Sequence, residues 1–136
     1  MIHKPLTLSY TFNEHEIERS IPARFEQVAA VLPAQLALIG NVSYTYDELN
    51  QAANRLAKHL DEQWHGIAEP VALLFDHDTS VIAAILGVLK AAKICAVLDP
   101  LAPPQRLQAI LDDLGAALLL TNHHHLPCLL YTSRCV

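Results

Sequence analysis

The stretch VALLFDHDTSVIAAILGVLKAAKICAVLDP, residues 71–100, decides the fold class of this chain. It opens and closes with the apolar runs 71–75 and 94–98, neither of which alternates apolar with polar residues. Runs of this length and pattern are typical of strands buried on both faces, as in a parallel sheet that helices cover. The segment between them, residues 81–92, is apolar nearly all round and predicts a buried helix. Residues 71–100 therefore predict a strand–helix–strand unit.

The alternation of predicted strands and helices continues toward the carboxyl terminus. Pro103 and Pro104 open another predicted helix, which ends before Gly115 and is followed by a strand within residues 116–121. Because the links are short, right-handed crossovers must join the strands into a parallel sheet. One face of the last helix carries Leu107, Ile110, Leu111 and Leu114. We expect an α/β fold, a partial doubly wound sheet of parallel strands with flanking helices: strands near 71–75, 94–98 and 117–121, helices near 80–92 and 103–114.

Local signals predict two helices upstream. Ser20 can cap the first, which has Pro22 in its first turn and ends at Pro33. Residues 36–39 then predict a short strand, followed by a turn at Gly40-Asn41. Residues 1–19 show no clean period and are expected to form an irregular lead-in to one coherent unit, residues 20–127.

The second upstream helix has the sharper signal. Thr45 and Glu48 have the spacing of a capping box, in which each side chain accepts a backbone N–H at the helix start. Apolar residues then recur at helical spacing to about Trp64, and Gly66 is the expected stop. For the later helix of residues 81–92, Asp78 or Thr79 is the expected cap.

Composition excludes several classes of protein. Hydrophobic residues make up 52% and charged residues 17%, which is enough for a core. The net charge of −5 argues against nucleic-acid and anionic-membrane partners, which need a basic surface. The start of the chain lacks a signal-peptide layout, and its longest apolar run, residues 81–89, is too short to span a bilayer. We expect a cytoplasmic protein without a disulfide framework, because Cys95 is the only cysteine in the coherent unit.

Two motifs give the chain a family resemblance. SYTYDELNQAANRLAKHL (43–60) and AAILGVLKAAKICAVLDPLAPPQRLQAILDDLGAALLLT (83–121) resemble the first two core motifs of the adenylate-forming enzymes, which include amino-acid adenylation domains, acyl-CoA ligases and luciferases. The match covers roughly residues 21–126 and is most like the adenylation domain of a nonribosomal peptide synthetase. The chain departs from the family at Ala92, Cys95 and Val97, where glycine, tyrosine and proline are usual.

The resemblance implies an ATP- and Mg²⁺-dependent ligase. Enzymes of this family activate a carboxylate as an acyl-adenylate with release of pyrophosphate, and a thiol then takes the acyl group. That thiol is the phosphopantetheine arm of a carrier protein or coenzyme A, and both acceptors stay open. The implied partners are the remainder of the adenylation domain and the carrier protein domain. The chain has no GxGxxG or GxxxxGK[ST] loop, and the family's working parts follow the two motifs, so the resemblance implies that this chain alone is inactive.

Other chemically capable residues have structural interpretations. Asp76, His77 and Asp78 follow a predicted strand, where we expect capping aspartates and a solvated histidine rather than a catalytic histidine. Cys95 lies within an apolar strand and is expected to be an inert, buried thiol. We predict no catalytic, cofactor-binding or metal residue: Asp99 should shape a loop, Glu48 and Tyr46 should cap and pack, and the run 123–125 (HHH) lacks a Cys or His partner at zinc-ligand spacing.

The last nine residues, CLLYTSRCV (128–136), break the pattern. One DNA encoding of them, read through a following stop codon, contains a palindrome like that of two transposase mosaic ends joined head to head in a sequencing adapter. We therefore expect a non-native tail that packs against nothing, the alternative being a genuine terminal strand.

Three functional hypotheses follow. The first is a truncated amino-terminal piece of an adenylate-forming ligase, and the alternative is a non-catalytic α/β interaction module that docks a neighbouring domain or carrier protein. An exposed apolar sheet edge would favour the first, and a polar, covered edge the second. A third hypothesis, a small Rossmann-type nucleotide binder, is disfavoured by the missing glycine loop.

Overall fold

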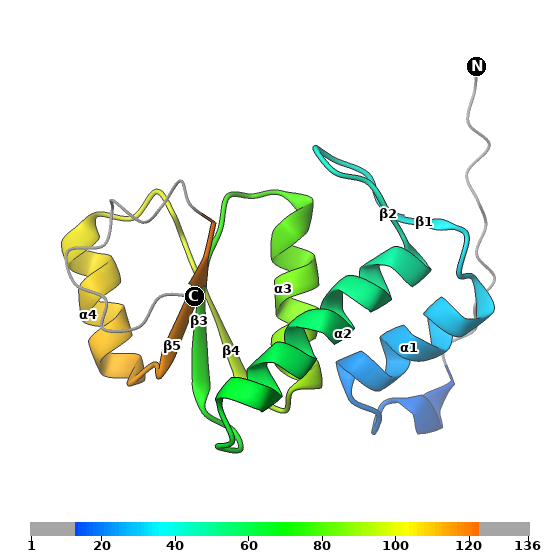
Figure 1. The fold of residues 1–136 in the computed structure, drawn as a ribbon, viewed down its shortest axis with the longest axis horizontal. Helices are drawn as coiled ribbons and strands as arrows, with labels where there is room; N and C mark the ends of the chain where they lie inside the picture. Colours follow the sequence, from blue (N-terminus) through cyan, green and yellow to red (C-terminus); the bar gives the residue numbers. More distant parts are fainter. Residues whose placement is uncertain (1–12, 123–136) are drawn as a thin grey trace.

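The computed structural model describes residues 13–122. Figure 1 shows a three-stranded sheet seen nearly edge-on, with helices on both of its faces, and a separate two-stranded ribbon. The elements in chain order are η1 (Glu14–Glu16), α1 (Ile21–Val31), β1 (Leu36–Leu38), β2 (Tyr44–Thr45), α2 (Tyr46–Gln63), β3 (Pro70–Leu74), α3 (Thr79–Lys90), β4 (Ile94–Leu98), α4 (Pro104–Leu114) and β5 (Leu118–Thr121).

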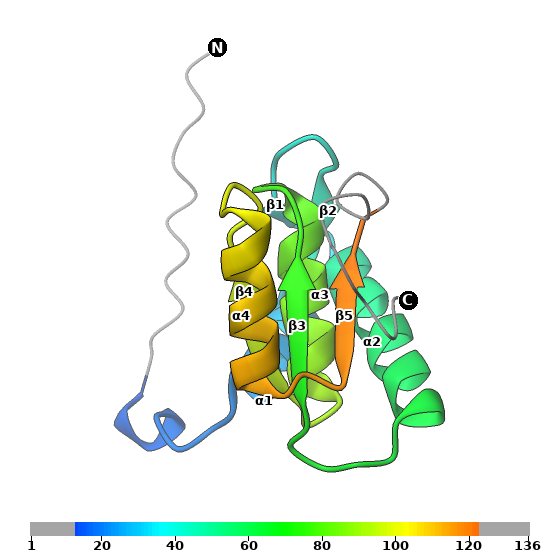
Figure 2. The same ribbon diagram turned by 90° about the vertical axis from the view of Figure 1, so that its left-hand side faces the viewer.

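The three-stranded sheet is parallel, with β3 in the middle and the order β4-β3-β5. Val71 pairs with Cys95 on one side and with Leu118 on the other. The predicted parallel pairing of the three strands is confirmed. β3 has a strand on each edge, and Figure 2 shows α4 in front of it and α3 behind it, so β3 is buried on both faces.

Two apolar layers enclose the sheet. On one face, Leu73 and Val71 of β3 pack with α2 and α3, around Leu60 and Val88. On the other face, Leu74 packs with α4 around Leu107. Figure 1 shows α4 alone on one side of the sheet and α3 and α2 on the other, with α1 lying beyond α2.

The helix starts follow the predicted caps. The side-chain oxygen of Ser20 accepts the Ala23 N–H at 3.3 Å. Thr45 and Glu48 form the predicted capping box, at 2.8 and 3.2 Å. Asp78, rather than Thr79, caps α3, because Thr79 is already the first helical residue. The predicted stop of α4 is also confirmed, since Gly115 takes the left-handed conformation (φ 59°).

The link between α2 and β3 departs from expectation. α2 ends at Gln63 and Trp64 is extended, while the left-handed residue of this link is Ala68 (φ 57°), not Gly66. A second alanine, Ala92 (φ 54°), has the same conformation between α3 and β4. The Ala68 N–H donates to the Ala92 carbonyl at 3.1 Å, so the two links support each other.

Two buried lysines join elements that are distant in sequence. The Lys90 ammonium of α3 contacts the Glu26 carboxylate of α1 and lies 2.9 Å from Asn50 Oδ1 of α2. The Lys93 ammonium donates to the carbonyls of Trp64, at 3.0 Å, and Gly66, and lies 3.5 Å from the Glu69 carboxylate. These contacts satisfy cations that would be costly to bury alone.

Three expectations from the sequence need correction. β4 is not buried on both faces: it is an edge strand whose Ile94 and Val97 are 49% and 55% exposed. Ile110 of α4 is 37% exposed, so it lies at the margin of the buried helix face. The buried α3 likewise leaves Ile82 37% exposed. In addition, β1 and β2 form an antiparallel pair that was not predicted, and a single 3-10 turn, η1, lies within the expected lead-in.

Candidate functional site

The carboxyl end of β3 is the place where an open parallel sheet usually binds ligands. A pocket of about 400 Å³ lies there, between the loop that leaves β3 and the loop that joins β1 to β2. It is lined by Ile39, Gly40, Asn41, Asp76, His77, Asp78 and Thr79. The three residues singled out in the sequence, 76–78, are therefore together on one wall, with segment 39–41 opposite.

Thr79 holds that opposite segment in place. Its hydroxyl donates to the Val42 carbonyl at 2.7 Å and lies 3.0 Å from Asn41 Oδ1. Gly40 is required by close approach, because a Cβ there would lie 2.7 Å from Thr79 Cγ2. The β1–β2 connection is thus fastened over the start of α3.

The start of α3 has the position of a phosphate site in doubly wound folds, but it is already capped. Asp78 Oδ1 accepts the Ser80 N–H at 2.8 Å and also the Ser80 hydroxyl. Asn41 Oδ1 accepts the Thr79 N–H at 3.5 Å, and Asn41 Nδ2 donates to Asp78 Oδ2 at 3.3 Å. The hydrogen bonds from Ser80 lower the pKa of the Asp78 carboxyl despite partial desolvation. A negative carboxylate therefore occupies the place of a phosphate, and these residues do not fit the triphosphate of ATP.

Asn122 bridges the carboxyl ends of β3 and β5. Its Nδ2 donates to Asp76 Oδ2 at 3.5 Å, and the neighbouring Thr121 hydroxyl donates to the Leu74 carbonyl at 2.6 Å. His77 is exposed beside this bridge. The expected roles of Asp78 as a cap and of His77 as a solvated side chain agree with these positions. The same capping role was expected of Asp76, but the N-cap of α3 is Asp78, and Asp76 accepts the Asn122 amide.

The other candidate residues lie apart from this pocket. Asp99 accepts the Leu101 N–H at 2.9 Å and shapes the loop after β4, as expected. The Tyr46 ring packs 6.0 Å from the Phe25 ring, and Glu48 caps α2. Cys95 is half-buried on the edge strand rather than fully buried, and desolvation raises the pKa of its thiol. The histidine run 123–125 and the segment 128–136 lie outside the described residues.

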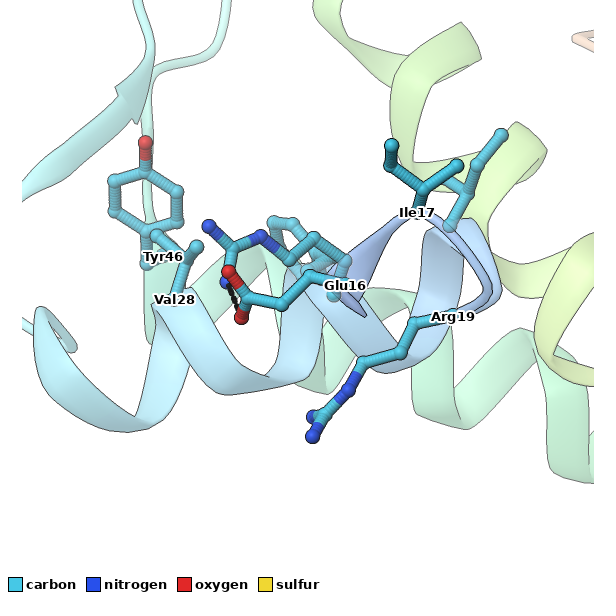
Figure 3. Close-up of a pocket in the computed structure, with 8 residues that line it drawn as sticks. Glu16, Ile17, Arg19, Val28 and Tyr46 are labelled. Atoms are coloured by element: carbon cyan, nitrogen blue, oxygen red, sulfur yellow. Dashed lines mark hydrogen bonds and ion pairs between the residues drawn. The ribbon is translucent and has the colours of Figure 1, made fainter. Parts of the chain in front are cut away.

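A second pocket, of about 430 Å³, was not predicted (Figure 3). It is lined by Glu16, Ile17, Arg19, Ile21, Arg24, Phe25, Val28 and Tyr46. Glu16 accepts the Asn13 N–H at 2.9 Å, and this hydrogen bond lowers the pKa of its carboxyl. The Asn13–Glu16 spacing, which resembles a capping box, was a sequence signal for the turn η1, but no local pattern signalled the pocket itself.

Metal ligation and membrane crossing both require recognisable groups of residues. Within residues 13–122, no three His, Cys, Asp or Glu side chains lie close enough to hold a metal ion. Nor does any helix in that range have both the length and the apolarity needed to cross a membrane.

The fold and its capped carboxyl-end loop define part of a doubly wound α/β domain, and comparison with known proteins identifies the domain. The sequence profile of the family described as "AMP-binding enzyme" matches residues 25–133. Because this match covers most of the sequence, the chain belongs to the AMP-binding enzyme family.

Curated relatives are peptide synthases of great length. The chain is 37% identical over 120 residues to tyrocidine synthase 3 of Brevibacillus parabrevis, a match to 88% of this chain and 2% of that protein. An N-(5-amino-5-carboxypentanoyl)-L-cysteinyl-D-valine synthase of Amycolatopsis lactamdurans is 41% identical over 107 residues, 74% of this chain and 3% of the relative. Gramicidin S synthase 2 of Brevibacillus brevis is 35% identical over 118 residues, 83% of this chain and 3% of the relative. The chain thus spans only a few per cent of the length of these relatives.

Solved structures support the fold. The nonribosomal peptide synthetase FmoA3, in a form with α-methyl-L-serine-AMP bound, superposes with a TM-score of 0.80 at 24% identity over 85% of this chain and 13% of that one. The NpsA N-terminal subdomain of Klebsiella oxytoca, in complex with 3-hydroxybenzoyl-AMSN, gives a TM-score of 0.81 at 18% identity. That match covers 93% of this chain and 32% of the subdomain, so the chain corresponds to about a third of it.

Proposed function

We propose that this chain is the amino-terminal part of an adenylation domain whose parent polypeptide activates an amino acid with ATP for transfer to a carrier-protein thiol. Transfer to coenzyme A is the alternative acceptor reaction. The observation that carries this proposal is the direct packing of the two family motifs. Gly87 of the second motif lies so close to Leu56 of the first that a Cβ at Gly87 would be 2.8 Å from Leu56 Cδ2. The two motifs thus pack against each other in one folded body, and the matches to synthases such as tyrocidine synthase 3 support the choice of parent enzyme.

In this proposal the described residues form a scaffold and the chain alone does not form acyl-adenylates. Enzymatic rate gains need about 8 kcal/mol or more of transition-state stabilisation. In phosphoryl and adenylyl chemistry most of this comes from amides, cations and metal ions around the phosphates. The start of α3, which has the usual position for phosphate contacts, is filled by Asp78 and Asn41 instead.

A non-catalytic docking module is the second candidate. The two hypotheses differ in what they require of the sheet edge, and β4 carries no charged residue while exposing Ile94 and Val97. Finished proteins usually blunt such an edge with charge or cover it. The open apolar edge therefore supports a scaffold that the rest of an adenylation domain covers.

Pyrophosphate exchange into ATP tests the proposal. The purified chain and the parent polypeptide, obtained by extending the reading frame in the source DNA, are assayed with a panel of amino and fatty acids. We expect exchange by the parent with an amino acid and none by the chain. Exchange by the chain that is lost on substitution within residues 1–127 would place the active site here, and a parent inactive with every acid would refute the activity.

A further inference from the structure

The pocket beside η1 presents apolar surface to solvent. Ile17 and Ile21 are 64% and 67% exposed at its rim, whereas Phe25, Val28 and Tyr46 are half-buried. Figure 3 shows Val28 and Tyr46 toward one end of the pocket and Ile17 toward the other. Its volume of about 430 Å³ is within the range of sites that hold small ligands or several side chains.

The acidic group in this pocket already has partners. Glu16 forms an ion pair with Arg24 at 2.6 Å and also accepts the Asn13 N–H. Arg24 in turn contacts Gln27 Oε1 at 3.3 Å. Glu16 and Arg24 neutralise each other, and apart from Arg19 the rest of the lining is aliphatic or aromatic, so most of the pocket surface offers apolar contact.

The chain itself supplies an apolar segment at the rim. Residues 1–12 lie outside the described part, and they join it at Asn13, whose N–H is 2.9 Å from Glu16 of the pocket wall. Residues 1–19 as a whole show no clean period, but the seven residues LTLSYTF within them alternate apolar residues (6, 8, 10 and 12) with Thr and Ser (7, 9 and 11). In an extended segment this alternation would place the apolar side chains on one side. Leu8 is four residues from Phe12, a reach of at most about 14 Å.

We propose that the pocket lined by Ile17, Phe25, Val28 and Tyr46 is the docking site for apolar side chains of the chain's own residues 6–12. The covalent connection to the pocket rim favours residues 6–12 over occupants that must bind from solution. A segment joined to the pocket rim has an effective concentration in the mM range. A second copy of the chain at micromolar concentration competes poorly with it. This docking is independent of the proposed enzymatic activity of the parent.

Hydrogen exchange followed by mass spectrometry tests the proposal on the full chain. The variant Leu8→Asp/Tyr10→Asp places charge on the apolar side of the segment, and the matched control Thr7→Asp/Ser9→Asp places the same charge on the polar side. We expect amides of residues 17–28 to exchange at least about tenfold faster in the first variant. The control should match wild type, and amides of β3 should be unchanged in both. Equal behaviour of the two variants at residues 17–28 would overturn the proposal.

A photo-crosslinking residue in place of Leu8 gives a second measurement that does not depend on stability. The expected crosslinks fall within the same chain on residues 17–28 or on Tyr46, and their yield is independent of protein concentration. Crosslinks elsewhere in the chain, or between two chains with a yield that rises with concentration, would identify another occupant and refute the proposal.

Discussion

The amide of Ala68 donates a hydrogen bond to the carbonyl of Ala92 at 3.1 Å, and both alanines have positive φ angles. The bond joins the link before β3 to the link before β4, beside the buried Lys93. Residues with a Cβ rarely adopt this conformation, which costs about 1–2 kcal/mol per residue. The amino-terminal ends of two neighbouring strands are therefore held by strained turns.

Replacing Ala92 by glycine should relieve this strain. Glycine adopts positive φ without penalty but loses more entropy on folding, so we expect a net stabilisation of about 0.5–1 kcal/mol. Chemical denaturation measures it. Ala91→Gly is the matched control: its φ is −77° and it is buried, so the change should destabilise. A loss of stability in Ala92→Gly would contradict the strain argument. The positive φ at this position is also a physical reason for the glycine that the family usually has there.

The crossing of α2 and α3 depends on Gly87. A Cβ there would lie 2.9 Å from Leu56 Cβ, which cannot move without the helix. Helix propensity alone favours alanine by about 1 kcal/mol, but overpacking costs about 1–3 kcal/mol, so we expect Gly87→Ala to destabilise. Gly115→Ala is the comparison, because a Cβ at Gly115 would meet no atom within 4 Å. Its loss of about 1 kcal/mol in unfolding free energy should come from the positive φ alone. The loss should be smaller in Gly115→Asn, because asparagine adopts positive φ more readily. A higher unfolding free energy in Gly87→Ala than in wild type would show that α2 and α3 can move apart at little cost, against this prediction.

Asp78 makes the stability of α3 depend on pH. Its hydrogen bonds from Ser80 lower its pKa in the folded state. The bonds therefore stabilise the fold above the unfolded pKa, about 3.9, and this contribution is lost as the pH falls through the lower folded value. Comparing Asp78→Asn with wild type by denaturation from pH 7 to pH 3, we expect the stability difference to shrink below about pH 4. Asp61→Asn, which removes the same charge from an exposed position on α2, is the charge-matched comparison.

Lys93 holds the strained links together through two carbonyls. Lys93→Met keeps the aliphatic stem but leaves the carbonyls of Trp64 and Gly66 without their donor, which should cost about 1–3 kcal/mol. The control Lys58→Met removes an exposed ion pair to Glu62 at 3.8 Å and should change the unfolding free energy by less than about 0.5 kcal/mol. Similar values for the two variants would show that the buried ammonium contributes nothing specific.

The open edge at β4 should govern self-association. Val97 is 55% exposed, so Val97→Lys should reduce aggregation of the isolated chain, measured by light scattering, with little loss of stability. Leu98→Lys is the neighbouring control, because Leu98 is buried under α4 and a lysine there should unfold the chain. If a folded Val97→Lys variant aggregated as much as wild type, a surface other than the β4 edge would have to drive the association.

Features set by neighbouring residues were predictable from the sequence. The caps at Ser20, Thr45 and Asp78 and the left-handed Gly115 each depend on one or two side chains and their spacing. The three parallel strands were predictable for a related reason, because continuous apolar runs with short links allow few other arrangements.

Features set by distant parts of the chain were not predictable. An apolar run such as β4 does not reveal whether it has a strand on both sides, so the exposure of Val97 was missed. β2 has only two residues, Tyr44 and Thr45, and it is a strand because β1 pairs with it. Both pockets depend on the same long-range packing. The pocket beside η1 joins Glu16 to Tyr46 across α1, a proximity that no local pattern encodes.

The contact of Lys90 with Glu26 spans 64 residues, and this span has a consequence for synthesis on the ribosome. At about 5–20 residues per second, roughly 3–13 s separate the appearance of the two partners. During that interval α1 has been made but lacks the cation that fastens it to α2 and α3. Before Lys90 is made, α1 can contact α2, where Phe25 packs against Tyr46, but not the complete α3, and the surface of α1 and α2 that α3 later covers is open to a chaperone.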